Sequence, residues 1–331
     1  MNNQSANEMC KVVIHMNDDF AKRFQEIESF FESSTKKWVF RGQRNSIRGL
    51  VSSLERKELP EWKVAKANWL AEITQNGKDV LSEYLREGFD EKWQQQIKEK
   101  EMAMIVRFKE RLRIDIDNDR QLIPYLAIMQ HYGIPTRLLD FTEEIAVALY
   151  FAFEKPRKAD ENNHRVIWAV QIDPIETHSK AHMTFFQNTN KCNDKEAWSL
   201  FAEELFKSDD RSMSSRLRRR VVPVWMSPNN PRMMAQKGLF LMTQHIGNGM
   251  FDFLNTLPPS ATQFKSPEYS IEEFLSLSKN KKKKIALIKI ICDDGLRSVA
   301  RRLLNERNIN RKTIYPNMAS VRKEICEEFN Y

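Results

Sequence analysis

The clearest hydrophobic pattern of the chain lies between residues 61 and 113, where apolar side chains recur at spacings of three and four. Such a spacing places them on one face of an α-helix. Breaks that contain glycine, at residues 76–77 and 88–90, divide the pattern, so it predicts two or three helices rather than one. Another helix is predicted upstream, starting after the N-cap Asn17 and burying Phe20, Phe24, Ile27 and Phe31.

Short runs rich in β-branched residues predict strands, at residues 37–41, 166–172, 220–226, 238–243 and 284–292. Helices are favoured at residues 122–132, 145–153, 196–206, 271–277, 295–306 and 317–329. Because a helix-rich part precedes a mixed part, we expect an α+β fold with a mixed or mostly antiparallel sheet. No linker rich in Gly, Ser and Pro is present, so residues 1–331 are predicted to form one domain, with residues 60–120 as a large helical insertion after the first strand.

The composition is that of a globular protein, with 41% hydrophobic and 30% charged residues. The longest apolar run, residues 145–153, is too short to cross a bilayer, so no membrane association is expected. The first residues lack the basic start and apolar block of a signal peptide. Four cysteines lie far apart, which argues against disulfides and a cysteine-based zinc site and predicts a cytoplasmic protein.

The net charge of +8 is concentrated in local clusters. They are Arg216 to Arg220, Lys281 to Lys284, and the group Arg297, Arg301 and Arg302. Basic surfaces attract partners that carry phosphate, such as nucleic acids or nucleotides. They also serve solubility, and we interpret the lysine run in that way.

The segment from Met129 to Glu154 carries the densest set of chemically capable side chains. These are Gln130, His131, Thr136, Arg137, Asp140 and Thr142. They directly precede an apolar helix with one face expected to be buried, and a buried helix can hold polar groups rigidly beside a cleft. We therefore predict the functional site here.

Each of these residues also has a purely structural interpretation. If residues 138–141 are extended, Asp140 and Thr142 point to the same side, but Thr142 can equally be the N-cap of the following helix. His131 can act as an acid or base, or simply suit a helix C-terminus. Arg137 and Asp140 can form a buried ion pair that only fixes geometry.

Two further stretches add candidates. Arg41 ends an apolar strand beside Gly42, where a guanidinium can grip phosphate and glycine lets a ligand approach, or where the arginine can form a salt bridge to a helix. Arg232 and Gln236 are four residues apart, so a helical turn places them on one face. Gly238 fits a helix C-terminus before a strand.

Other site classes are disfavoured. His178 and His182 have the spacing of zinc ligands on a helix, but no acidic residue lies between them and no third ligand is evident, so no metal site is predicted. The chain also lacks a phosphate-binding loop, a Gly-x-Ser-x-Gly elbow and a dinucleotide-binding glycine fingerprint.

Three stretches together resemble the FRG-domain family, which is named for a Phe/Tyr-Arg-Gly signature. They are Phe40-Arg41-Gly42-Gln43, residues 130–142 with the helix at 148–152, and residues 232–240. The closing residues 314–316 match more loosely, so the resemblance spans about residues 35–320. Phe141 stands where the family often has tryptophan.

A second resemblance is to a group of ADP-ribosyltransferases. Their first strand ends in aromatic-Arg-Gly, as at Arg41-Gly42, and a Ser-Thr-Ser strand precedes an Ala/Phe-rich helix, as Asp140-Phe141-Thr142 does here. They carry a later glutamate near the position of Gln236. A glutamine can hydrogen-bond the nicotinamide ribose but cannot stabilise positive charge at its anomeric carbon, so another acid such as Asp140 must do this, or the site binds without transferring.

The resemblance implies an ADP-ribosyltransferase-like fold that uses NAD as substrate and transfers ADP-ribose to a protein, a nucleic acid or water, as a toxin or anti-phage factor would. It assigns the reacting centre to Arg41, His131, Asp140, Thr142 and Gln236. NAD contacts fall to Arg41, Gly42, Gln43, Thr136, Arg137 and Arg232. Alternatives are a non-catalytic module that binds nucleic acid or a nucleotide through the arginine clusters, and a scaffold whose polar motif is a buried hydrogen-bond network.

Overall fold

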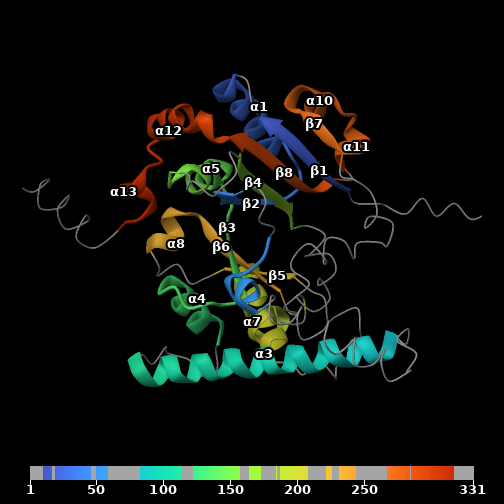
Figure 1. The fold of residues 1–331 in the computed structure, drawn as a ribbon, viewed down its shortest axis with the longest axis vertical. Helices are drawn as coiled ribbons and strands as arrows, with labels where there is room; N and C mark the ends of the chain where they lie inside the picture. Colours follow the sequence, from blue (N-terminus) through green and yellow to red (C-terminus); the bar gives the residue numbers. More distant parts are fainter. Residues whose placement is uncertain are drawn as a thin grey trace, which may run out of the picture.

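The computed structural model describes residues 10–16, 19–45, 50–58, 83–112, 122–156, 164–172, 184, 187–207, 221–225, 231–243, 267–283 and 285–316. Within these ranges, helices surround a mixed sheet of eight strands (Figure 1). The mixed sheet is as expected from the sequence. No helix in the described ranges is long and apolar enough to cross a bilayer.

The strands lie in the order β5-β6-β3-β2-β4-β8-β1-β7. Their bounds are β1 Cys10–Met16, β2 Trp38–Gln43, β3 Leu138–Thr142, β4 His164–Gln171, β5 Val221–Val224, β6 Gly238–Thr243, β7 Glu268–Ser270 and β8 Ile285–Asp293. Strand β1 is parallel to both β8 and β7, and the other pairings are antiparallel. The sequence pattern did not predict β1 or β7, although β1 is nearly central in one half of the sheet.

The sheet is divided between β2 and β3. These two strands pair at a single register position, Phe40 with Thr142, whereas β2 pairs with β4 and β3 with β6 along their lengths. One half therefore holds β1, β2, β4, β7 and β8, and the other holds β3, β5 and β6. Figure 1 shows the smaller half turned away from the larger one.

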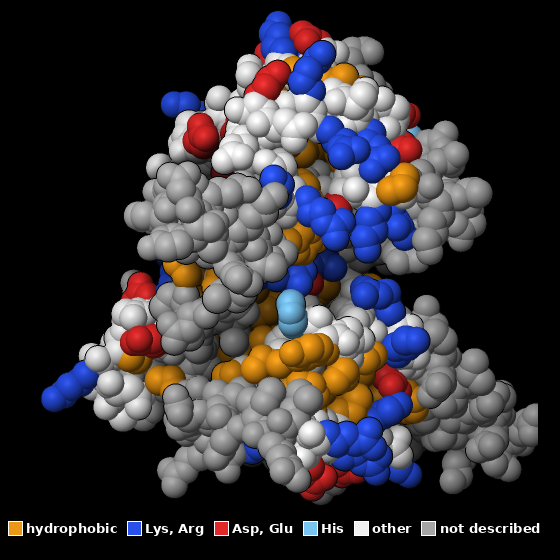
Figure 2. Space-filling view, turned by 90° about the vertical axis from the view of Figure 1, so that its left-hand side faces the viewer, with side chains coloured by type: hydrophobic (Ala, Val, Ile, Leu, Met, Phe, Trp, Pro, Cys, Tyr) orange, Lys and Arg blue, Asp and Glu red, His pale blue; other side chains and the backbone are white. Residues whose placement is uncertain are grey.

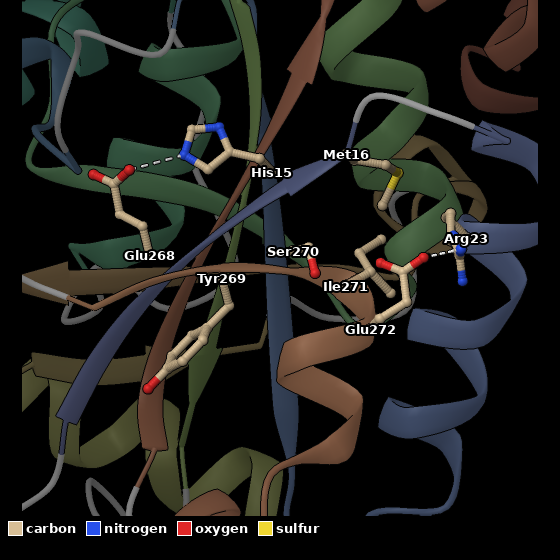
Figure 3. Close-up of a pocket in the computed structure, with 8 residues that line it drawn as sticks. All are labelled: His15, Met16, Arg23, Glu268, Tyr269, Ser270, Ile271 and Glu272. Carbon is tan, nitrogen blue, oxygen red and sulfur yellow. Dashed lines mark hydrogen bonds and ion pairs between the residues drawn. The ribbon is translucent and has the colours of Figure 1, made fainter.

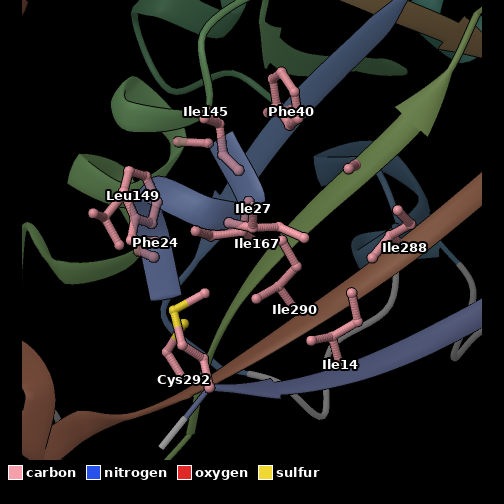
Figure 4. Packing of buried hydrophobic residues seen from close by; sticks show 14 of the residues in the cluster. Ile14, Phe24, Ile27, Phe40, Ile145, Leu149, Ile167, Ile288, Ile290 and Cys292 are labelled. Carbon is pink, nitrogen blue, oxygen red and sulfur yellow. The ribbon is translucent and has the colours of Figure 1, made fainter. Parts of the chain in front are cut away.

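The larger half is covered by helices α1 (Phe20–Glu32), α5 (Ile145–Phe153), α10 (Ile271–Ser276) and α12 (Arg297–Glu306). Their apolar faces meet the sheet in a core that includes Phe24, Ile27, Leu149, Ile167 and Ile290 (Figure 4). The predicted buried face of α1 is confirmed, because Phe20, Phe24, Ile27 and Phe31 are all buried. The N-cap of α1 is Asp19, and the predicted cap Asn17 lies outside the described residues.

The smaller half packs against α3 (Glu83–Leu112), α4 (Ile123–His131) and α7 (Asp194–Lys207). The predicted break at residues 88–90 is wrong, because α3 runs through it as one 30-residue helix. A glycine inside a helix costs only about 1 kcal/mol relative to alanine, which a long helix tolerates. The break at 76–77 lies outside the described residues.

The remaining elements are short. They are α8 (Pro231–Ala235), α11 (Lys279–Lys283), the 3₁₀ turn η3 (Asp294–Leu296) and α13 (Arg311–Ile314), and residues 53–58 are also helical. The predicted helix at 295–306 begins two residues later because η3 occupies its start. The predicted helix at 317–329 lies outside the described residues.

Candidate functional site

A cavity of about 310 Å³ lies where β2 and β3 separate. Its walls come from β2, α4, β3, α5, α8 and β6, so segments that are distant in sequence meet around it. Its polar lining consists of Arg41, Gln130, His131, Asp140, Thr142, Arg232 and Gln236. Figure 2 shows a hollow across the middle of this face, with Lys and Arg side chains gathered around and above it. This volume is at the lower end of those that hold small-molecule ligands.

Arg41 is a largely buried cation of the cavity, with 17% of its side chain exposed. Its Nη1 donates to the carbonyl oxygen of Asp140 at 2.6 Å, and the same nitrogen lies 3.6 Å from the Asp140 carboxylate. Its Nε is buried and has no hydrogen-bond partner among the residues that the structure describes. Burial lowers the pKa of the Arg41 guanidinium, and the neighbouring Asp140 opposes that shift. Because arginine remains charged in proteins, Arg41 is a partly desolvated cation whose Nε–H can donate to a ligand.

Asp140 is held in place by a chain of hydrogen bonds. The Thr136 hydroxyl donates to Gln130 Oε1 at 2.5 Å, and Gln130 Nε2 donates to Asp140 Oδ1 at 2.7 Å. The Asp140 side chain is nevertheless 64% exposed, so it faces the open part of the cavity. Among the described lining residues it is the only carboxylate. The chain of bonds therefore orients the one negative group that a ligand would meet.

Thr142 joins β3 to the segment before β6. Its hydroxyl donates to the Gln236 carbonyl oxygen at 2.7 Å and accepts the Glu144 N–H at 3.1 Å. The N-cap residue of α5 is Glu144, so the interpretation of Thr142 as the N-cap is corrected by two residues. The Thr142 hydroxyl still accepts a backbone N–H at the start of α5, so a hydroxyl side chain has a structural role at this position.

His131 and Gln236 are both tied to neighbours at the cavity rim. Arg232 Nη1 lies 3.0 Å from His131 Nδ1, and an arginine can only donate, so the contact requires the neutral tautomer with the proton on Nε2. The Arg232 guanidinium also lies 4.6 Å above the ring of Tyr315. Gln236 Nε2 donates to the Ile314 carbonyl oxygen at 3.1 Å, which holds the end of α13 beside the cavity.

Comparison with protein families matches residues 36–161 to the FRG domain. The chain contains an FRG domain. No curated protein and no solved structure matches it. The matched range runs from just before β2 to just beyond α5, so it includes the first two of the three sequence stretches.

The four residues of the first FRG stretch, residues 40–43, have different structural roles. Phe40 belongs to the core beneath α5, and Arg41 reaches the cavity. Gly42 also lines the cavity, but a Cβ there would collide with the carbonyl oxygen of Ala148 in α5. Glycine is thus needed for close packing of α5 on β2. Gln43 does not line the cavity, because its Oε1 accepts the indole N–H of Trp168 at 3.1 Å.

Thr136 and Arg137, which were predicted to contact the ligand, are buried and do not line the cavity. Thr136 instead donates to the lining residue Gln130. Arg137 is only 4% exposed and pairs with the fully buried Glu101 of α3, with an Nε to Oε2 distance of 2.6 Å. The structure therefore corrects the suggested pair of Arg137 with Asp140: Arg137 attaches the helical insertion to the core, and Arg41 takes the place beside Asp140.

Sequence reasoning missed several residues at the site. Glu101 lies in a run of mixed charge on α3, and no local signal distinguishes it from its exposed neighbours. Phe151 lines the cavity from α5, and Tyr315 contacts both Phe151 and Arg232. The loose match at residues 314–316 was the only sequence signal for Tyr315.

A second cavity, of about 340 Å³, lies at the edge formed by β1, β7 and α10 (Figure 3). Its charged side chains are already paired, His15 with Glu268 and Arg23 with Glu272. Both contacts lie at the surface, with the Glu268 and Glu272 side chains 60% and 56% exposed, so this cavity has no buried charged group among the residues described as lining it.

Several candidates fall outside the described residues, namely His178, His182 and Arg216 to Arg220. In the part of the chain that the structure describes, no group of three or more His, Cys, Asp or Glu residues is arranged to hold a metal ion.

Proposed function

We propose that the cavity binds NAD and that the FRG domain is part of an ADP-ribosyltransferase-like enzyme that cleaves the nicotinamide–ribose bond. The observation that supports this most is the position of Arg41. Its largely buried guanidinium has one donor, Nε, without a partner in the described part of the chain, and it lies beside Asp140, at the point where the two halves of the sheet separate. A buried cation next to an oriented carboxylate suits a ligand that carries negative phosphates at one end and develops positive charge at the other.

In this proposal, the pyrophosphate of NAD binds beside the arginines of the cavity. Arg41 Nε can donate to a phosphate oxygen, and a bound anion would offset the cost of burying the guanidinium. Arg232 on α8 provides a second guanidinium in the cavity lining. With Nδ1 occupied by Arg232, His131 keeps its Nε2–H as a donor for a ligand oxygen.

Asp140 would provide the electrostatic part of the chemistry. As the N-glycosidic bond breaks, nicotinamide leaves with the bonding electron pair and positive charge develops on the ribose. The Asp140 carboxylate stabilises this charge while an acceptor hydroxyl or water attacks the anomeric carbon and releases its proton to solvent, since nicotinamide leaves as a neutral molecule. Because Gln130 fixes one carboxylate oxygen, the group needs little reorganisation.

Gln236 and Thr142 would position the ribose. The Gln236 amide nitrogen is engaged by Ile314, which leaves its oxygen to accept from a ribose hydroxyl. The Thr142 hydroxyl donates to the Gln236 carbonyl oxygen and so fixes the backbone from which the Gln236 side chain extends. The neutral Gln236 amide cannot stabilise the positive charge on the ribose, so in this proposal Asp140 alone does so.

Release of labelled nicotinamide from NAD by the purified full chain tests the proposal, with and without added protein or RNA acceptors. Arg41→Ala should lower release at least 100-fold and weaken binding of ADP-ribose at least 10-fold, because a charge-assisted hydrogen bond contributes about 1.5–3 kcal/mol. Arg302→Ala, an exposed arginine on α12, is the control and should behave as wild type. Absence of release by the wild type under all acceptor conditions, or full activity of Arg41→Ala, rejects the proposal.

A further inference from the structure

The surface beside the cavity carries positive charges that have no acidic partner in the described part of the chain. Arg301 on α12 and Arg311 and Lys312 on α13 are exposed, and they form no ion pair with any residue in the described ranges. This differs from Arg307 of the same region, whose Nη1 lies 2.6 Å from a Glu28 oxygen. Unpaired cations on a folded surface favour a polyanionic partner because they repel one another and gain most from phosphate.

Three aromatic rings lie among these cations. The rings of Tyr150 and Phe151 on α5 both contact the ring of Tyr315, with centroid distances of 6.3 and 6.4 Å. All three side chains are partly exposed. Burial and Glu154 raise the pKa of Tyr150, whereas Arg311 and Arg301 act in the opposite direction, which places both arginines within electrostatic reach of its hydroxyl. The cations and rings therefore form one surface.

This surface is continuous with the cavity. Phe151 is part of the cavity lining, and the lining residue Arg232 stacks on Tyr315. The lining residue Gln236 is hydrogen-bonded to Ile314 of α13. A chain molecule bound over α13 would therefore reach the cavity mouth without crossing any acidic side chain that the described contacts place there, apart from Glu154 at the end of α5.

We infer that the surface formed by Tyr150, Phe151, Arg301, Arg311, Lys312 and Tyr315 binds single-stranded nucleic acid and leads it to the cavity. Cationic side chains follow the phosphates, and aromatic faces stack on unpaired bases, which a duplex does not present. An acidic peptide would use the charges but not the rings. The further claim that the bound strand is the acceptor of ADP-ribose rests on the proposed function, whereas the binding claim does not.

Fluorescence anisotropy with a labelled single-stranded RNA or DNA tests the binding, using the full chain at several salt concentrations. The test variant is Arg301→Gln/Arg311→Gln/Lys312→Gln. The matched control is Lys92→Gln/Arg107→Gln/Lys281→Gln, which removes three exposed cations from α3 and α11, again without ion pairs among the described residues. Thermal melting of both variants is the check that they fold.

The test variant should bind at least 10-fold more weakly than wild type, and the control within about 3-fold. Single strands respond to salt with a log–log slope of about −0.7 per phosphate contact, so three lost contacts should make the slope shallower by about 2. Equal losses in both variants, equal affinity for a duplex of the same length, or equal competition by polyglutamate of the same charge would each overturn the inference.

Nicotinamide release separates this inference from the proposed function. If both hold, the test variant loses modification of the oligonucleotide but keeps release of nicotinamide to water. If the wild type binds the strand and never releases nicotinamide, the binding surface stands and the proposed chemistry fails. If the wild type releases nicotinamide but does not bind the strand at about 50 mM salt, the chemistry stands and this inference fails.

Discussion

Arg41 Nη1 donates to the backbone carbonyl of Asp140 across the gap between β2 and β3. The two residues are 99 positions apart in sequence and come from different halves of the sheet. The bond means that the guanidinium is placed by the backbone of the opposite half, and only secondarily by the Asp140 carboxylate, whose nearer oxygen is 3.6 Å away. Substituting the Asp140 side chain should therefore leave Arg41 in position.

Asp140→Asn distinguishes catalysis from a structural role. The side chain is 64% exposed, and asparagine keeps an oxygen to accept from Gln130, so we expect the melting temperature to change by less than about 2 °C. Nicotinamide release should fall at least 100-fold, because the amide cannot stabilise positive charge. A loss of activity that merely follows a loss of thermal stability would instead favour the hydrogen-bond scaffold interpretation.

The buried pair of Arg137 and Glu101 gives a stability prediction. Glu101→Gln leaves a cation that is 4% exposed without its counter-charge, so the free energy of unfolding should fall by about 3–5 kcal/mol in urea denaturation. The double variant Glu101→Leu/Arg137→Met should recover much of this, because it removes both buried charges. Removing the exposed pair of Lys195 and Glu143 as a control should change the free energy by no more than about 1 kcal/mol.

Gln236→Glu tests how α13 is attached. The carboxylate cannot donate to the Ile314 carbonyl and would repel it, so α13 should loosen by about 1–3 kcal/mol. Hydrogen exchange of the amides at residues 311–315 should become faster, and Gln236→Met, which removes the donor without adding charge, should have a smaller effect. Unchanged exchange in both variants would show that this hydrogen bond does not hold α13.

Cys292 gives a pH-dependent prediction. Burial raises the pKa of its thiol to about 12 from the usual value of 9.0. The unfolded chain thus loses this proton at a lower pH than the native chain, so the contribution of Cys292 to stability is complete below pH 9 and decreases between pH 9 and 12. In native protein at pH 8.5, Cys292 should resist alkylation that Cys192 undergoes, as mass spectrometry can show, and Cys292→Val should flatten the alkaline decline.

The local patterns of the sequence were good guides to elements whose apolar residues are buried. Strand β6 has the predicted bounds, and α5 and α10 begin at the predicted residues, because their apolar periodicity reflects burial directly. Strand β1 was missed because its partner β8 is almost 280 residues away and its side chains do not alternate clearly. Parallel pairing across such a distance leaves no signal in a local window.

The candidate site was predictable only in part for a similar reason. Arg41, Asp140 and Gln236 were identified from their own motifs, and the structure brings them to one cavity. Arg137 looked equivalent to Arg41, since both are arginines beside apolar strands. What separates them is a distant residue, Glu101, and nothing in the sequence near Arg137 indicates which acid it meets.

Strands β2 and β3 share one point of backbone pairing, but a hydrophobic core spans the seam between them, with Val39 and Trp168 from the larger half and Phe141 and Leu241 from the smaller half. Separating the two halves would therefore expose apolar side chains of this core to water, which opposes a hinge motion at the cavity. A guest should then fit into a preformed space, and its binding should leave the packing across the seam unchanged.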